Sequence, residues 1–367
     1  MILTGETQLS LDVSKLDNKV CKQKRNLLQK NNCVMNNDPV AIRDKTFLQQ
    51  LVLVDGQPGC GKAVLDPAVA SMERVELLQF SFEIEYMCAL RYLGKITSDG
   101  AETMIKLQAD IALYETMMSR NVNFRLSDQS SAFKDPNFWV YIKRLFTKGN
   151  MLIPERIKKE RPILHFMTHN LLGLSKPIFN SLGDKVAIIE LVRHPISMLA
   201  QQTLYNEWWS TSLGQMRQFN FDIKYNEEQI PFWTKGYEEL YLKSNPVERA
   251  IYDMQQQIER VESFKNKFKE VYKSQCITIP FEKFVVAPWP YMERIEALLK
   301  TKMNRKTKKM LKKARVPRDN TGIEANELIN KRNFAIQNGA SKDALRVLGQ
   351  ISEQYEDKYD LSNQKQK

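Results

Sequence analysis

The stretch Val54–Leu65, VDGQPGCGKAVL, decides the fold that we predict for this chain of 367 residues. Gly56 through Lys62 satisfy the phosphate-loop pattern G-x-x-x-x-G-K in full. Such loops bind phosphate because bare backbone N–H groups converge on its oxygens, and the helix that follows adds its positive end. The apolar run in Phe47–Val54 predicts a buried strand before the loop, and helical material is expected from about Ala68 to Leu93.

Ala63 stands where this motif usually carries Ser or Thr. ATPases and nucleotide kinases use that hydroxyl to place Mg²⁺, which neutralises the charge of the transferring phosphoryl group. Sulfuryl transfer has no such need, because backbone amides and basic side chains hold the donor nucleotide. The loop therefore favours a phosphate site without a metal.

Short apolar runs and helical patterns alternate along the rest of the chain. Val247–Tyr272 has apolar residues every three or four positions, which predicts a helix. Three runs are typical of parallel strands covered on both faces: Pro162–Thr168, Lys185–Val192 and Cys276–Ile279. We predict an α/β, three-layer P-loop-type fold with a central, mostly parallel sheet covered by helices. This domain is expected over 47–352, between a polar, partly disordered extension at 1–46 and a polar tail at 353–367.

The positive charge of the chain is local. Ten basic residues and no acidic one lie within Lys300–Arg318, and without those ten the net charge of +12 falls to +2. A nucleic-acid-binding surface spread over the whole protein would look different, so we expect no nucleic-acid partner.

The cysteines and the first residues of the chain indicate the cellular compartment of the protein. Five cysteines are scattered without a CxxC pair, which indicates neither a disulfide framework nor a zinc site. The start, MILTGETQLSLDVSK, lacks the order of a signal peptide, and no run of about 18 apolar residues indicates a membrane span. We therefore expect a cytoplasmic protein and make no prediction of its oligomeric state.

A second anion-binding loop is predicted at Leu191–Gln202, LVRHPISMLAQQ, which follows the apolar run IIELV. Arg193 offers a fixed fork of donors at the end of a strand, and the helix start after Pro195 offers backbone amides. An ordinary Arg-Pro turn is the alternative interpretation of this stretch taken alone.

Together the two loops resemble those of the sulfotransferase family, which uses 3′-phosphoadenosine 5′-phosphosulfate (PAPS) as donor. PGCGKA, Pro58–Ala63, is similar to the family loop P-K-S-G-T-T, and RHPISMLAQ, Arg193–Gln201, is similar to R-x-P-x-x-x-x-x-S. The pair Thr168–His169 lies at the family's distance before Arg193, with His169 24 residues upstream of it. The segment IPFEKFVVAPWPYMERIEALL is similar to the family's later strand, Pro and helix. The resemblance spans roughly 50 to 320.

The resemblance implies a set of donor-binding residues and one departure in each loop. The family lysine follows the proline directly, where this chain has Gly59, and we expect Lys62 to reach the same oxygens from the helix start. Gln201 replaces the family serine, and Ser197 is a second candidate for that role. Arg318 lies in the segment RVPRDNTG, which faintly resembles the family's late loop. The donor-binding residues are therefore expected to be Gly56, Pro58, Gly59, Cys60, Gly61, Lys62, Ala63, Arg193, Ser197, Gln201 and Arg318.

The implied reaction is an in-line displacement in which a base takes the proton of an acceptor hydroxyl as its oxygen attacks sulfur. His169 is the candidate base, and Lys62 is the candidate catalytic cation. Glu83 and Glu85, in SFEIEYM, are the alternative, because heparan-type carbohydrate sulfotransferases place a catalytic Glu about 20 residues past the loop. Two acids in an apolar stretch need a partner or a task, although a charged face on an ordinary helix is the more common explanation.

The acceptor is indicated by one irregular region, 203–245, in which aromatic residues alternate with glutamates. Flat aromatic faces beside carboxylates suit a sugar, so we favour a carbohydrate hydroxyl as acceptor and leave a lipid or small-molecule hydroxyl open. The aromatic residues are Trp208, Trp209, Phe219, Phe221, Tyr225, Phe232, Trp233, Tyr237 and Tyr241.

Two other functions stay open at this point. A P-loop kinase or NTPase would use Glu190, at the end of a predicted strand, as its acidic metal ligand. A catalytically inactive nucleotide- or polyanion-binding protein is favoured by Gly59 and Gln201, where the family has Lys and Ser.

Overall fold

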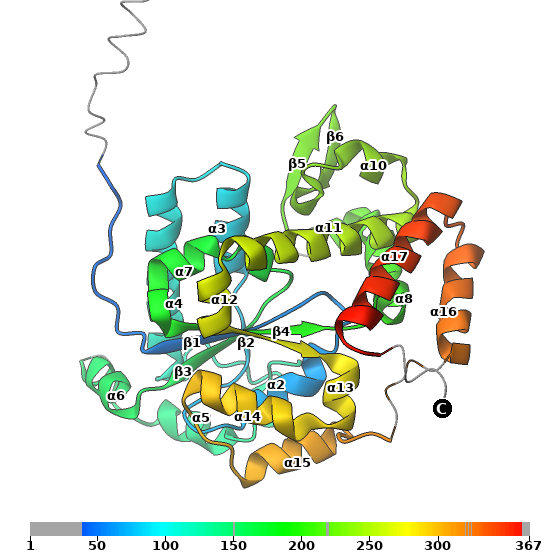
Figure 1. Ribbon diagram of the computed structural model, residues 1–367. Coiled ribbons are helices and arrows are strands. Elements are labelled where there is room, and N and C mark those ends of the chain that lie inside the picture. The colour runs from blue at the N-terminus through cyan, green and yellow to red at the C-terminus, as the bar shows by residue number, and fades with distance from the viewer. Residues whose placement is uncertain are drawn as a thin grey trace, which may run out of the picture. The chain divides into compact units, whose positions relative to one another are not determined.

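The sheet at the centre of the fold has five parallel strands in the order β2-β3-β1-β4-β7 (Figure 1). The computed structural model describes residues 39–149, 151–217, 220–319, 321, 323 and 325–361. The strands are β1 Gln50–Asp55, β2 Gln79–Phe80, β3 Ile163–Met167, β4 Val186–Val192 and β7 Cys276–Pro280. The α/β class and the four predicted strands are confirmed.

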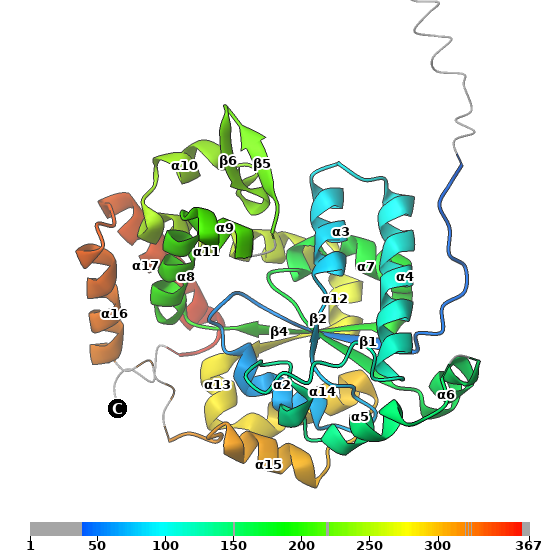
Figure 2. The same ribbon diagram turned by 180° about the vertical axis from the view of Figure 1, so that it is seen from behind.

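The side chains of β1 alternate between the two faces of the sheet. Val52 and Val54 belong to the core on one face, and Leu51 and Leu53 belong to the core on the other. The first core is covered by α2 Lys62–Ala70, α13 Phe281–Val286, α14 Pro288–Leu299 and α15 Arg305–Lys313. The second is covered by α3 Phe82–Tyr92, α4 Ser98–Thr116, α6 Leu152–Glu160, α7 Lys176–Leu182 and α12 Lys269–Gln275 (Figure 2). Helices thus cover both faces of the sheet, whose strands β1, β3 and β4 are almost wholly buried.

Four longer helices lie at the carboxyl ends of the strands. They are α8 Pro195–Trp209, α11 Pro246–Lys267, α16 Ala325–Gln337 and α17 Lys342–Lys358. Smaller elements complete the unit: α5 Phe138–Leu145, α9 Ser212–Arg217, α10 Glu238–Lys243, the antiparallel pair β5 Asp222–Tyr225 and β6 Glu228–Pro231, and the 3-10 turns Ala132–Lys134, Leu172–Leu174, Gly183–Lys185 and Phe232–Thr234. No helix within the described ranges is both long and apolar enough to span a membrane.

Two predicted helical stretches differ from the structure. The helical stretch expected at Ala68–Leu93 is α2, a short strand β2, and α3. The helix expected at Val247–Tyr272 is interrupted at Phe268, whose φ of −119° and ψ of 46° are not helical. Tertiary packing sets each of these boundaries, and the spacing of apolar residues along the chain does not reveal it.

The expected terminal segments lie partly outside the described residues, namely at 1–38 and 362–367. Residues 42–367 form one unit, and Met1–Ala41 form another. Arg43, at the start of the larger unit, donates to the buried carboxylate of Asp110 on α4 at 3.0 Å. At the other end α17 continues through Glu353, where we expected the tail, and buries Tyr355.

Candidate functional site

The phosphate-type loop connects β1 to α2, and its glycines are required by its contacts. Gly56 and Gly61 have φ values of 147° and 101°. A Cβ atom would lie 2.3 Å from the carbonyl oxygen of Leu191 at Gly56, and 2.3 Å from the ring of Phe281 at Gly61. Any side chain at either position would therefore open the loop.

Lys62 begins α2 and turns its side chain back over the loop. Its ammonium group donates to the carbonyl oxygen of Gly56 at 2.5 Å and to that of Gln57 at 3.4 Å. The side chain is only 6% exposed, which places a buried cation against main-chain carbonyls. Ala63 follows on the cavity side and supplies no hydroxyl for a metal.

The second loop meets the first because β4 lies next to β1 in the sheet. Arg193 follows β4, and its Nη1 donates to the carbonyl oxygen of Gly59 at 2.9 Å. Its guanidinium lies over the ring of Phe281, 4.6 Å from the centroid. The Nε–H of Arg193 is buried and has no hydrogen-bond partner among the described residues. The two predicted loops are thus joined by a cation that keeps one free donor.

Three further predicted donor residues lie around Arg193. Arg318 covers the same Phe281 ring at 5.4 Å, and burial together with the nearby Arg193 lowers the pKa of its guanidinium. Ser197 accepts a hydrogen bond from Lys331 at 3.4 Å. Gln201 lines the cavity beside Gly59, whose φ of 88° leaves room for the Gln201 amide. A second arginine and a lysine therefore accompany Arg193, as an anion site requires.

Pro58 and Cys60 contribute main-chain groups to the loop. The carbonyl oxygen of Pro58 accepts from Gln202 at 2.7 Å. The Cys60 side chain is buried in the core, and burial raises the pKa of its thiol.

The end of β3 is fixed by a carboxylate at the end of β1. Asp55 accepts from the hydroxyl of Thr168 at 2.9 Å and from the backbone N–H groups of Leu171 and Leu172 at 3.0 and 2.8 Å. These three bonds satisfy the carboxylate within a buried turn. The turn holds His169 at the mouth of the cavity.

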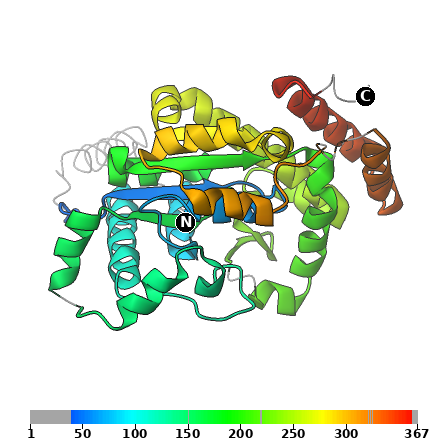
Figure 3. The same ribbon diagram turned by 90° about the horizontal axis from the view of Figure 1, so that it is seen from below.

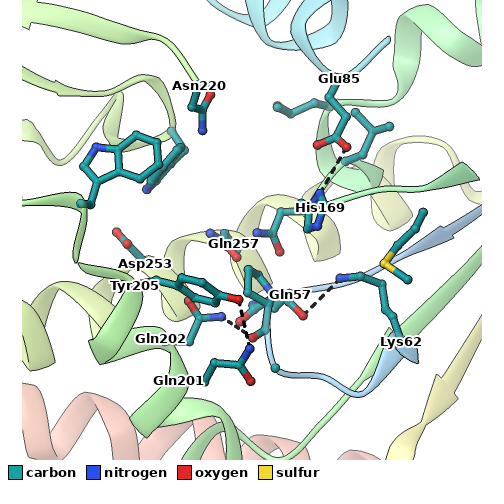
Figure 4. A pocket seen from close by; sticks show the side chains of 18 of the residues that line it. Gln57, Lys62, Glu85, His169, Gln201, Gln202, Tyr205, Asn220, Asp253 and Gln257 are labelled. Atoms are coloured by element: carbon teal, nitrogen blue, oxygen red, sulfur yellow. Dashed lines mark hydrogen bonds and ion pairs between the residues drawn. The ribbon is translucent and has the colours of Figure 1, made fainter. Parts of the chain in front are cut away.

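His169 faces Glu85 of α3, as Figure 4 shows. Its Nδ1 lies 3.3 Å from Oε1 of Glu85, and Phe80 and Phe82 lie parallel to its ring. Burial raises the pKa of the Glu85 carboxyl, and the contact with His169 opposes that rise. With Nδ1 directed at Glu85, Nε2 is the ring nitrogen left for another partner.

The other predicted acid, Glu83, is not brought to this site. It lines a separate cavity of about 320 Å³ and accepts from Ser81 at 3.4 Å. The two acids diverge because they are two residues apart on a helix, where neighbours on one face are three or four apart.

The other two histidines are core residues. His165 is fully buried on β3, with Nε2 3.2 Å from Asp66 of α2. His194 is fully buried as well, and its Nε2 lies 2.9 Å from Glu356.

One cavity of about 530 Å³ unites the two loops with His169 and Glu85. Its far end is formed by the 203–245 region and α11, where Trp209, Phe232 and Trp233 lie beside Asp253. Asp253 accepts from Tyr237 at 2.7 Å, and burial raises the pKa of its carboxyl to about 6. Phe219, named in the sequence analysis, lies outside the described residues.

Four buried polar atoms of the cavity wall have no hydrogen-bond partner among the described residues. They are Gln57 Oε1, Tyr86 OH, Arg193 Nε and Gln257 Oε1. Buried polar groups are rarely left unpaired, so four in one cavity indicate a polar ligand. Figure 4 shows Gln57 and Gln257 in the middle of the cavity and Asp253 across from the His169–Glu85 pair.

The sequence analysis missed Asp253 and Gln257. Both lie on the buried side of α11 in the apolar series Ile251, Met254 and Ile258. Two polar residues spaced by four within an apolar series were the available signal, because a buried acid needs a partner or a task.

Glu190, the acid that a kinase would need as a metal ligand, is already paired with two other side chains. Lys265 forms an ion pair with it at 2.8 Å, and Thr278 donates to the same oxygen. Within the part of the chain that the structure describes, no cluster of three or more His, Cys, Asp or Glu side chains is placed to hold a metal ion.

Comparison with known proteins gives matches among solved structures. The chain is similar to the sulfotransferase domain from the Synechococcus PCC 7002 olefin synthase, with 12% identity and a TM-score of 0.43 over 86% of this chain and 98% of that one. It is also similar to sulfotransferase STF9 from Mycobacterium avium, with 13% identity and a TM-score of 0.42 over 86% of this chain and 78% of that one. The sulfotransferase domain from the curacin biosynthetic pathway is 11% identical, with a TM-score of 0.43 over 83% of this chain and 98% of that one. No protein-family model and no curated protein sequence matches the chain. At such low values we assign function from the residues of the site.

Proposed function

We propose that this protein is a sulfotransferase that moves a sulfuryl group from PAPS to an acceptor hydroxyl. The observation that carries the proposal is the convergence of Lys62, Arg193, His169 and Glu85 on one cavity. Two cationic loops at the carboxyl ends of adjacent strands suit a donor with phosphate groups, and the position matches the ligand sites of open α/β sheets.

The residues fit such a donor. Lys62 and the N–H groups of the Gly56–Gly61 loop would hold the 5′-phosphosulfate, because they are the buried donors nearest the start of α2. Arg193, with its unpaired Nε–H, and Arg318 beside it would hold the 3′-phosphate. When bound, PAPS supplies the sulfuryl group and the leaving phosphate.

The reaction needs a base that takes the proton of the substrate hydroxyl to which the sulfuryl group is transferred. Nε2 of His169 would take that proton, while Glu85 holds Nδ1–H and stabilises the imidazolium that forms. The acceptor oxygen then bonds to sulfur as the sulfur–oxygen bond to the nucleotide phosphate breaks. Lys62 and the loop amides would stabilise the charge on the departing phosphate.

The far end of the cavity supports a polyhydroxylated acceptor, with a carbohydrate as the class that we favour. Trp209, Phe232 and Trp233 offer flat apolar faces. Gln257 Oε1 offers an unpaired acceptor beside them. Sugars present CH faces and hydroxyls together, so they would satisfy both kinds of group.

A thermal-shift experiment with phosphoadenosine phosphate, ATP and GTP, each with and without Mg²⁺, tests the donor assignment. A ligand at a hundred times its Kd stabilises the fold by about 2.7 kcal/mol. We expect phosphoadenosine phosphate to stabilise the protein equally with and without Mg²⁺. Stabilisation by Mg-ATP alone would refute the proposal and support the kinase alternative.

Calorimetry on two variants tests the donor residues. Lys62→Ala and Arg193→Ala should each weaken phosphoadenosine phosphate binding by about 1.5–3 kcal/mol, the contribution of a hydrogen bond to a charged group. Lys273→Ala is the control, because Lys273 is an exposed cation that does not line the cavity. Unchanged affinity in Arg193→Ala would reject its assignment, and binding without sulfuryl transfer or donor hydrolysis would identify an inactive binding protein.

A further inference from the structure

Large apolar side chains are exposed on α5, on α6 and on the turns beside them. Trp139 is 70% exposed, Phe146 is 84% exposed and Met151 is 88% exposed. Five more exposed apolar residues lie in the same part of the chain: Leu126, Phe133, Val140, Leu145 and Leu152. Scattered apolar residues are normal on a surface, but a cluster of this size marks an interaction site.

Two of the exposed aromatic rings, Phe133 and Trp139, are joined by the half-buried ring of Phe138. Phe138 lies 4.7 Å from Phe133 and 5.2 Å from Trp139, measured between ring centroids. Trp139 and Phe146 are seven residues apart, so they lie on one side of α5 and its last turn. The rings therefore form one surface.

A basic helix lies beside this surface. α15 buries Thr307, Met310 and Leu311 against the core, which leaves its lysines facing outward. Lys306 donates to Asn137, at the start of α5, at 2.7 Å, and this bond joins the two helices. Figures 1 and 2 place α5, α6 and α15 along the same edge of the molecule, and Figure 3 views that edge from below with α15 in orange.

The positive charge of α15 is not neutralised by its neighbours. Lys308, Lys309, Lys312 and Lys313 are exposed, and none of them forms an ion pair with a carboxylate in the described part of the chain. Such uncompensated charge favours an anionic partner.

We propose that α5, α6 and α15 form a surface that docks onto an anionic lipid bilayer. We call this surface the basic–aromatic face and define it by Phe133, Trp139, Phe146, Met151, Lys308, Lys309, Lys312 and Lys313. Amphipathic surfaces bind bilayers when aromatic and aliphatic side chains enter the headgroup region while lysines meet anionic headgroups. Lysine stems also cover apolar surface while their ammonium groups stay in water.

The combination of the two side-chain types selects this partner. A polyanion such as nucleic acid would use the lysines but would leave Phe146 and Met151 in water. An acidic protein surface would pair with the lysines of α15 but would leave the large exposed apolar side chains of α5 and α6 in water. A bilayer with anionic lipids satisfies both halves of the face.

The basic–aromatic face is separate from the cavity described above. None of its eight defining residues is among the described residues that line the 530 Å³ cavity. Docking therefore leaves the cavity open, and the proposal does not depend on the reaction that occurs there.

Vesicle sedimentation with the full chain tests the proposal. The vesicles are phosphatidylcholine alone or phosphatidylcholine with about 30% phosphatidylserine, at about 0.1 M and 0.5 M salt. We expect binding to the anionic vesicles to exceed binding to the neutral vesicles by about tenfold or more, and to fall at high salt because exposed charges are screened. Equal binding to both vesicles, or binding to neither, would overturn the proposal, and the second result would point to a protein partner.

Matched variants locate the contact. The quadruple variant Lys308→Gln, Lys309→Gln, Lys312→Gln, Lys313→Gln should lose about tenfold or more in binding, and Trp139→Ser with Phe146→Ser should lose several-fold. The control removes the same charge from exposed lysines elsewhere: Lys224→Gln, Lys243→Gln, Lys273→Gln, Lys342→Gln. All three proteins should unfold at the wild-type temperature, because the changed side chains are exposed. Equal loss in the control would show that net charge, and not this face, drives binding.

Discussion

Two histidine–carboxylate pairs lie four residues apart on and just beyond β3, and they have nearly the same geometry. His165 lies 3.2 Å from Asp66, and His169 lies 3.3 Å from Glu85. Burial raises the pKa of both carboxyls, and in both the histidine opposes the rise. The pairs differ in access: the His165 and Asp66 side chains are 0% and 1% exposed, whereas those of His169 and Glu85 are 35% and 14% exposed.

The comparison shows that the pair itself does not define a catalytic site. His165 sits in the middle of β3 under α2, where the contact pairs one ring nitrogen with one carboxylate oxygen inside the core. His169 lies past the end of the strand, where the Asp55 turn exposes its ring to the cavity. The same interaction should thus act on stability in one place and on turnover in the other.

The largest expected effect is on turnover in His169→Ala. If His169 is the base, this variant should lose about 10²-fold or more in rate, which corresponds to about 2.7 kcal/mol, because the acceptor hydroxyl loses its proton acceptor. Sulfuryl transfer to an acceptor, or slow donor hydrolysis, measures the loss. Phosphoadenosine phosphate affinity and the unfolding temperature should stay at wild-type values. Full activity in this variant would remove His169 from the mechanism.

The matched change in the core, His165→Ala, should act on stability instead. It leaves the Asp66 carboxyl without its partner in a buried site and should cost about 2 kcal/mol in the free energy of unfolding. Urea unfolding measures this cost, and the rate per folded molecule should stay within about threefold of wild type. A variant of normal stability and low rate would show that the buried pair takes part in the chemistry.

Asp253 extends the comparison to a buried acid without a histidine. Burial raises its pKa to about 6 from 3.8, so the folded state keeps a proton that the unfolded state loses in this window. The unfolded state then binds fewer protons, and the stability contribution of this group is lost as pH rises from about 4 to about 6. Asp253→Asn should remove this loss, about 2–3 kcal/mol, in unfolding measured at about pH 4 and pH 7. Identical pH profiles for variant and wild type would show that the pKa of Asp253 is the same in the folded and unfolded states.

Most of the fold and the positions of the two predicted loops could be predicted from the sequence. Apolar runs identify β1, β3, β4 and β7 because parallel strands are buried on both faces. Local patterns placed Lys62 and Arg193 at the ends of β1 and β4, and the adjacency of those strands then brings the two residues together.

The far end of the cavity, beside Trp233 and Asp253, could not be predicted in the same way. Asp253 and Trp233 meet because α11 packs beside the 203–245 region, a long-range contact that no local pattern records. Glu83 and Glu85 were indistinguishable in sequence, since both are acids in one short stretch. Only the rotation of α3 assigns Glu85 to His169 and Glu83 to the other cavity.

Glu85→Gln tests the role of the carboxylate in the accessible pair, His169 and Glu85. The amide keeps the size of the side chain but removes the negative charge that would stabilise the imidazolium of His169. We expect turnover to fall about tenfold, which corresponds to about 1.4 kcal/mol, with little change in acceptor KM. The pH profile of kcat should change as well, which a purely structural role would not produce. An unchanged profile would assign Glu85 to packing.

The smallest effect is expected for Glu83→Gln, the control for Glu85→Gln on the same helix. Glu83 is exposed, lines the separate 320 Å³ cavity, and has a 3.4 Å contact with Ser81. Exposed substitutions of this kind change stability by less than about 0.5 kcal/mol, and nothing in the geometry connects this carboxylate to His169. Turnover, KM and the unfolding temperature should therefore match wild type when measured beside Glu85→Gln. Should Glu83→Gln abolish turnover while Glu85→Gln retains it, the proton acceptor is reached through the other side of α3, and the difference between the two histidine pairs no longer locates the active site.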